Sequence, residues 1–183
     1  MKLVKAFLSA CACAGAILAA PASMAADISH APAPLILVDG TGTFGASFLS
    51  GNAGNTFSDK YLFSTIGLNF VDTLVGSIAH SSMVGLTVTG YDLYDFTDTL
   101  VAPGTMQSTG VVDLWTIATG GIAAGNYYVK VTGSVVSNGS ASYAGNLNVT
   151  PVPEPTTYAM LLAGLGLVAV GARRRAAPEP AFS

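Results

Sequence analysis

Three aspartates follow one another at a spacing of three residues, Asp92, Asp95 and Asp98. Calcium takes six to eight oxygen ligands, usually from a loop with alternating Asp or Asn residues and a Gly at the turn. This segment lacks that Gly and that alternation. On a strand, Asp92 and Asp98 would share one face and Asp95 would take the other. We therefore expect a solvated acidic edge that discourages strand-to-strand aggregation, with calcium binding as the alternative.

The two histidines, His30 and His80, are the remaining candidates for catalysis. A Ser-His-Asp hydrolase would need a serine at a nucleophile elbow, and His80 precedes Ser81 and Ser82. The body, however, contains no G-x-S-x-G sequence. Both cysteines, Cys11 and Cys13, lie near the N-terminus. We expect a protein that is not an enzyme and that carries no cofactor and no metal.

A third candidate is the aromatic segment 57–63. On one strand, Phe57, Asp59, Tyr61 and Phe63 share a single face. A carboxylate among aromatic rings is costly to bury unless it is hydrogen-bonded. We expect Asp59 to accept backbone N–H or hydroxyl bonds at a bulge or strand entry, and a ligand or ion role remains the alternative.

The elements that would position these residues are strands. Residues 27–150 contain no Glu and no Arg, and eight Asp against two Lys give a formal charge of −6. That charge argues against nucleic acid or anionic lipid as a partner. The abundance of Gly, Thr, Ser, Val and Tyr favours strands and turns over helices.

Several windows alternate with period two and are bounded by Gly, Asn or Pro. They predict nine strands, at 35–38, 43–49, 57–63, 66–74, 83–90, 91–96, 111–117, 127–132 and 143–149. This spacing indicates an all-β, antiparallel β-sandwich or jelly-roll-like body over residues 26–150, with a barrel as the lesser alternative.

Both ends of the chain indicate export. Residues 1–25 read as a signal peptide, with a basic start, an apolar stretch and small residues before a signal peptidase site at Ala25 or Ala26. A lipoprotein signal ending at Cys11 is the alternative. A signal helix is therefore expected to precede the body.

The C-terminal apolar run, residues 158–172, makes a single helix about 22 Å long against a hydrocarbon core of about 30 Å. It is a marginal transmembrane span. Arg173, Arg174 and Arg175 follow as a stop-transfer signal, which would leave residues 177–183 cytoplasmic and the body outside. An ordinary C-terminal anchor would have the same elements.

The order of Val152, Pro153, Glu154 and Pro155, the apolar run and the three arginines resembles the PEP-CTERM sorting signal of Gram-negative bacteria. The resemblance places the signal at residues 151–176. It implies that an exosortase, a membrane enzyme, recognises and cuts near Pro-Glu-Pro. It also implies that the protein is anchored only transiently in the inner membrane and ends at the cell surface or outside the cell. An association with exopolysaccharide or biofilm is implied as well.

The set Phe57, Asp59, Tyr61 and Phe63 resembles the FxDxF family of PEP-CTERM proteins, as do residues 122–133 and 142–149. That family supplies no catalytic residue to carry over. The expected function is thus a structural surface or matrix protein. The alternative is a small carbohydrate- or calcium-binding module that uses Tyr91, Tyr94, Tyr128 or Trp115 as a stacking surface.

Overall fold

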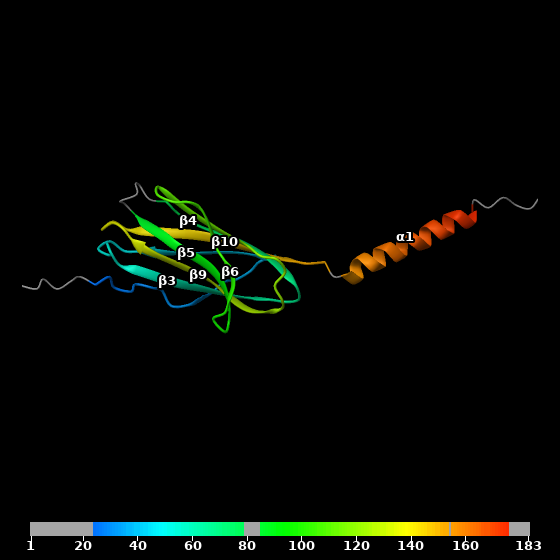
Figure 1. Ribbon diagram of the computed structural model, residues 1–183, viewed down its shortest axis with the longest axis horizontal. Helices are drawn as coiled ribbons and strands as arrows, with labels where there is room; N and C mark the ends of the chain where they lie inside the picture. The colour runs from blue at the N-terminus through cyan, green and yellow to red at the C-terminus, as the bar shows by residue number, and fades with distance from the viewer. Residues whose placement is uncertain (1–23, 79–84, 154, 176–183) are drawn as a thin grey trace, which may run out of the picture.

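The computed structural model describes residues 24–78, 85–153 and 155–175. These residues form ten strands and one helix (Figure 1). The elements are β1 Ala33–Pro34, β2 Thr41–Phe48, β3 Thr56–Thr65, β4 Asn69–Ile78, β5 Leu86–Asp95, β6 Leu100–Pro103, β7 Thr105–Ser108, β8 Val112–Ala118, β9 Gly125–Val135, β10 Ala141–Pro151 and α1 Pro155–Arg175.

The strands form two five-stranded sheets. Sheet A has the order β1-β3-β9-β5-β6, and sheet B has the order β2-β10-β4-β8-β7. All neighbours are antiparallel except β1 and β3, which run parallel. The expected antiparallel sandwich is confirmed, and the barrel alternative is wrong because the two sheets remain separate.

The period-two pattern determines which side chains fill the space between the sheets. On β3, Phe57, Asp59, Tyr61 and Phe63 are all buried, while Ser58 and Ser64 are exposed. Burying the apolar side chains contributes about 25 cal/mol for each Å² removed from water. Aromatic rings from both sheets meet there, including Phe44 of β2 against Tyr61, at 4.7 Å between ring centroids.

The expected strand pattern needs four corrections. The window at 66–74 is displaced, because residues 66–68 lie outside any strand and β4 runs from Asn69 to Ile78. Residues 35–38 are not a strand; they lead from the two-residue β1 into a turn closed by the pair Val38 and Thr41. The two windows at 83–90 and 91–96 are one strand, β5, whose register against β9 shifts between Val88 and Gly90. Strands β6 and β7 were not predicted from the sequence.

Strands β6 and β7 take the chain from one sheet to the other. Strand β6 pairs with β5 in sheet A, and one residue later β7 pairs with β8 in sheet B. The residue between them is Gly104, where a Cβ atom would lie 1.9 Å from the Tyr91 carbonyl oxygen. The crossing therefore requires a residue without a side chain.

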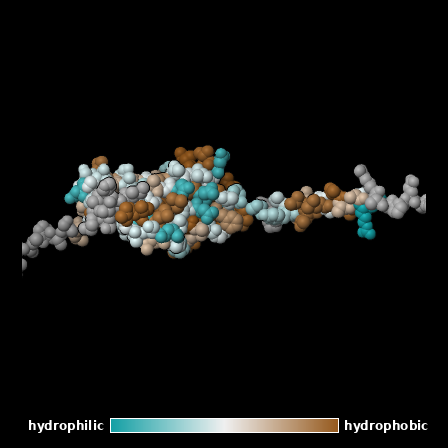
Figure 2. Space-filling model, turned by 90° about the horizontal axis from the view of Figure 1, so that it is seen from above, coloured by the Kyte–Doolittle hydropathy of each residue, from teal (hydrophilic) through white to brown (hydrophobic). Residues whose placement is uncertain are grey.

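After β10 the chain leaves the sandwich and enters α1 within a few residues (Figure 1). Residues 156–174 are long and apolar enough to span a membrane, and none of that segment is buried against the sandwich. Figure 2 shows apolar surface along this helix and apolar patches on the visible face of the body. The exposed apolar surface of the helix is thus typical of a segment that lies in lipid.

Candidate functional site

Asp59 lies in the middle of β3, opposite Val131 of β9, and is 1% exposed. Its Oδ1 accepts a 2.6 Å hydrogen bond from the backbone N–H of His30. Its Oδ2 accepts a 2.6 Å bond from the hydroxyl of Tyr143 on β10. The carboxylate therefore accepts one backbone N–H bond and one hydroxyl bond, at a regular strand position rather than at a bulge.

The two tyrosine hydroxyls extend this network. The Tyr61 and Tyr143 oxygens lie 2.9 Å apart, and because Tyr143 donates to Asp59, Tyr61 donates to Tyr143. Burial raises the pKa of Tyr143, and its bonds to Asp59 and Tyr61 raise that pKa further. Burial also raises the pKa of Tyr61. Both hydroxyls thus stay protonated, which Tyr143 requires to donate to Asp59 and Tyr61 requires to donate to Tyr143.

His30 closes the network from the N-terminal side. Its Nδ1 lies 3.3 Å from Asp59 Oδ2, while about half of its side chain stays exposed. The neighbouring residues are bound to β3 as well, because Ser58 N–H donates to Ser29 Oγ and Ile28 N–H donates to the Thr56 carbonyl. Asp59 therefore joins the N-terminal segment to both sheets.

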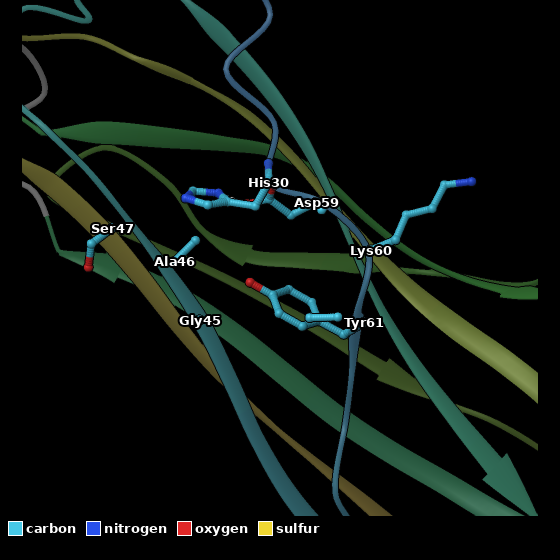
Figure 3. Close-up of a pocket in the computed structure, with 9 residues that line it drawn as sticks. His30, Gly45, Ala46, Ser47, Asp59, Lys60 and Tyr61 are labelled. Carbon is cyan, nitrogen blue, oxygen red and sulfur yellow. Dashed lines mark hydrogen bonds and ion pairs between the residues drawn. The ribbon is translucent and has the colours of Figure 1, made fainter.

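A cavity of about 460 Å³ opens beside this network between β2 and β3 (Figure 3). His30 lies against Asp59 there, whereas the Lys60 side chain points away from the cavity. The remaining wall consists mainly of the small residues Ala31, Ala33 and Gly45–Ser47. The lining presents the His30 imidazole as a hydrogen-bonding group, but few other groups that would bind a ligand.

The three aspartates 92, 95 and 98 do not converge. Asp92 accepts from Gly104 N–H, and Asp95 accepts from Thr97 and Thr99 within the β5–β6 turn. Asp98 accepts instead from Lys60 and Tyr128. The expected acidic edge is also wrong, because β6 covers that side of β5. In the described ranges, no three His, Cys, Asp or Glu side chains gather to hold a metal ion.

The tyrosines expected to form a stacking surface are occupied elsewhere. Tyr91 is fully buried, and its hydroxyl is hydrogen-bonded to Thr73. Tyr94 and Tyr128 stack on each other with ring centroids 5.3 Å apart. Lys130 lies over the Tyr94 ring and Lys60 lies over the Tyr128 ring. These faces are already taken by cation–π and ring contacts.

Trp115 and Asp113 have a structural role that the sequence did not reveal. Both point from β8 across the sandwich to Val88, at the bulge in β5: Trp115 Nε1 donates to the Val88 carbonyl, and Val88 N–H donates to Asp113. Asp113 also accepts from Thr109 and Gly110. The only sequence signal for this pair was its spacing of two on an alternating strand.

A shallow groove lies on the outer face of sheet B, with a volume of about 370 Å³. Asp72 of β4 and Asn146 and Asn148 of β10 line it, together with Thr116 of β8. Leu74 forms part of its floor, between Asn146 and Thr116 in the strand register. The groove combines hydroxyl-binding groups with an aliphatic surface.

The predicted sorting segment lies at the junction of body and helix. Val152 N–H donates to the Leu68 carbonyl at 2.9 Å, and Pro153 is exposed. Pro155 is the first residue of α1, a position where its missing N–H costs nothing. Arg173 and Arg174 are exposed near the helix end, where Arg175 is the last residue. Glu154 lies outside the described residues.

The predicted signal peptide and one histidine also fall largely outside the described ranges. Residues 1–23, His80 and the tail at 177–183 lie outside the described residues. Ala25 is exposed, whereas Ala26 already belongs to the body, because its N–H donates to Asn55 and its carbonyl accepts from Thr56. Cleavage after Ala25 would leave this contact intact.

Residues 151–175 match the protein family described as the PEP-CTERM protein-sorting motif. This match confirms the expected sorting segment and supports an exported, exosortase-sorted protein. No curated protein matches the chain. Among solved structures, the chain is similar to the pre-peptidase C-terminal domain of a collagenase from Bacillus anthracis, with 22% identity, 69% of this chain and 94% of that chain covered, and a TM-score of 0.34. The likeness at this score carries no conclusion about function.

Proposed function

We propose that this chain is an exported, non-enzymatic surface or matrix protein that an exosortase processes at Pro153–Pro155. Signal peptidase would first cut after Ala25 or Ala26. Helix α1 would then hold the body outside the inner membrane of a Gram-negative cell, with the arginines on the cytoplasmic side. Removal of α1 would release or transfer the body, which serves as a structural component beside exopolysaccharide.

The position of the sorting segment carries the proposal. The matched segment begins at the last residue of β10 and ends at the last residue of α1. A cut in the Pro-Glu-Pro stretch would therefore fall between the folded body and the membrane helix. Among the described residues, the buried apolar side chains of the core all belong to the body, so they would be retained.

The network around Asp59 fits a structural body. Within the described ranges, no buried side-chain polar atom lacks a hydrogen-bond partner. A carboxylate that is already satisfied by protein donors has little to offer a substrate. Membership of the FxDxF family remains a prediction, in which Phe57, Asp59, Tyr61 and Phe63 are core residues rather than a binding site.

The test is the intact mass of the protein from cells with and without the exosortase. We expect the chain from exosortase-containing cells to begin at Ala26 or Asp27 and to end near Pro153–Pro155. Without the enzyme, residues 158–175 should remain. Glu154→Ala should retain them in both strains, and Ser142→Ala on the exposed face of β10 is the matched control. Retention of residues 158–175 in native protein from both strains would mean a plain membrane anchor.

The groove on sheet B favours one second candidate, a carbohydrate-binding module. Asp72, Asn146 and Asn148 offer a carboxylate and two amides beside Leu74, a combination that suits sugar hydroxyls and the apolar face of a sugar ring. Calorimetric titration with the exopolysaccharide of the producing cells tests it. Binding that Asn146→Ala with Asn148→Ala abolishes, and Ser142→Ala leaves intact, would support it; no heat with the native protein would contradict it.

A further inference from the structure

Four large apolar side chains surround the point where the chain leaves the sandwich. Ile66 is 94% exposed and Val38 is 67% exposed, while Leu68 and Phe70 are exposed by 51% and 40%. We call Val38, Ile66, Leu68 and Phe70 the apolar collar. Exposed aliphatic residues are common singly, but their concentration around one exit point is a feature of an interaction surface.

Hydrogen bonds join the turns that carry the collar to the last residues of β10, where the chain leaves the sandwich. Val149 N–H donates to the carbonyl of Gly40, in the turn that carries Val38, at 2.7 Å. On the other side of β10, Val152 N–H donates to the Leu68 carbonyl at 2.9 Å. Phe70 lies opposite Thr150 in the β4–β10 register. The two turns therefore flank β10 over its last residues.

The connection to α1 keeps the collar close to the bilayer. Pro151 ends β10 and Pro155 begins α1, and four residues of extended chain span at most about 14 Å. The apolar run of α1, residues 158–172, is about 22 Å long, and about 26 Å with Thr156 and Thr157, so it is shorter than a hydrocarbon core of about 30 Å. A short span draws its flanking residues toward the lipid, and here the flanking residues include the collar.

The charged residues near the collar indicate what kind of membrane surface the collar would bind. Asp39 stands beside Val38 and Asp72 lies two residues beyond Phe70, whereas both lysines of the body, Lys60 and Lys130, lie opposite each other on sheet A. A basic patch would attract anionic headgroups, but the charged residues adjacent to the collar in sequence, Asp39 and Asp72, are carboxylates. Binding here would rest on apolar contact.

We propose that the apolar collar docks on the lipid surface while α1 spans the bilayer, so that the body stands on the membrane with Pro153–Pro155 at the interface. The inference rests on the membrane stage of the proposed function. Docking fixes the height of the Pro-Glu-Pro stretch above the membrane. A membrane-embedded enzyme would then meet it at a constant depth.

Depth-dependent quenching by spin-labelled lipids tests the docking. The mature protein, which begins after Ala25 or Ala26 and so lacks both Cys11 and Cys13, is purified from cells without the exosortase and reconstituted in phosphatidylcholine vesicles. Single fluorescent labels are placed at Ile66→Cys in the collar, at Leu49→Cys at the opposite end of the sandwich, and at Leu165→Cys in α1. Leu49 is 81% exposed, so it is matched to Ile66 in accessibility.

We expect the label at position 66 to be quenched about twofold or more relative to the label at 49, as for a group at the headgroup boundary. The same result at high salt would support apolar docking. Equal quenching at 66 and 49, with strong quenching at 165, would overturn the docking and leave the proposed function intact. No quenching at 165 would overturn both. Quenching at 66 that appears only at high protein-to-lipid ratio would indicate contact with a second copy and would also overturn the proposal.

Discussion

At the scale of single residues, the buried carboxylate of Asp59 connects parts of the chain that are far apart in sequence. It bonds His30 and Tyr143, which lie 29 positions before it and 84 positions after it. A charge this deep is stable only while its donors are present. The structural role of Asp59 is therefore to join the N-terminal segment to the two sheets.

Removing the Asp59 carboxylate should leave the His30 N–H and the Tyr143 hydroxyl without their acceptor. We expect Asp59→Ala to lower the free energy of unfolding of the body by about 2–3 kcal/mol, measured by urea denaturation. Asp72→Asn on the exposed face should change it by less than about 0.5 kcal/mol. Asp59→Ala combined with Tyr143→Phe should cost less than the two single changes added, because both remove the same bond. Additive costs would show that the network is not coupled.

Because three tyrosines are buried, we expect the folded body to lose stability at high pH. Burial raises the folded-state pKa of Tyr61, Tyr91 and Tyr143 above the ordinary value of 10.0. Their contribution to stability is therefore fully present below pH 10 and is lost as pH rises through the folded pKa values. In an alkaline titration followed by tyrosine absorbance, these three hydroxyls should ionise together with unfolding. Independent ionisation of all tyrosines near pH 10, with the fold intact, would contradict this.

At the scale of elements, the crossing between β6 and β7 depends on Gly104. Its N–H donates to Asp92, and its Cα faces the Tyr91 carbonyl too closely for a side chain. The crossing places β6 on the edge of sheet A and β7 on the edge of sheet B. Gly104 thus allows one continuous segment of the chain to form an edge strand in each sheet.

Gly104→Ala should force the backbone apart at this crossing and lower the free energy of unfolding by about 1–3 kcal/mol. Gly120→Ala is the matched control, because a Cβ there would meet no atom within 4 Å. Thermal unfolding followed by circular dichroism measures both. Equal melting temperatures for the two variants would mean that the crossing tolerates a side chain.

How far the sequence predicts the elements depends on their length. Alternation over residues 57–63 correctly placed Phe57, Asp59, Tyr61 and Phe63 on one face of β3, and that face is buried. Strands β6 and β7 have four residues each, too few to show a period. The windows 83–90 and 91–96 were read as two strands, whereas Gly90 at their boundary lies at the bulge in β5. The partners of Asp59 could not be predicted, because local periodicity contains no information about which distant strand lies opposite.

At the scale of the whole molecule, the charges are separated along the chain. Residues 27–150 carry a formal charge of −6, and Arg173, Arg174 and Arg175 follow the apolar segment. Because positive residues are retained on the cytoplasmic side, this asymmetry favours one orientation of α1. The short apolar segment makes the arginines more important, since a marginal span holds its position weakly.

Changing Arg173, Arg174 and Arg175 to Gln should therefore weaken the stop and let the helix pass through the membrane. Arg173→Lys, Arg174→Lys and Arg175→Lys together form the control, because they keep the three charges. In cells without the exosortase, fractionation should recover the native and Lys forms in the membrane, and the Gln form partly in the soluble periplasm with residues 158–175 still attached. If the Gln form stayed in the membrane as fully as the Lys form, the apolar segment alone would be sufficient as an anchor, and the three charges would have no part in stopping transfer.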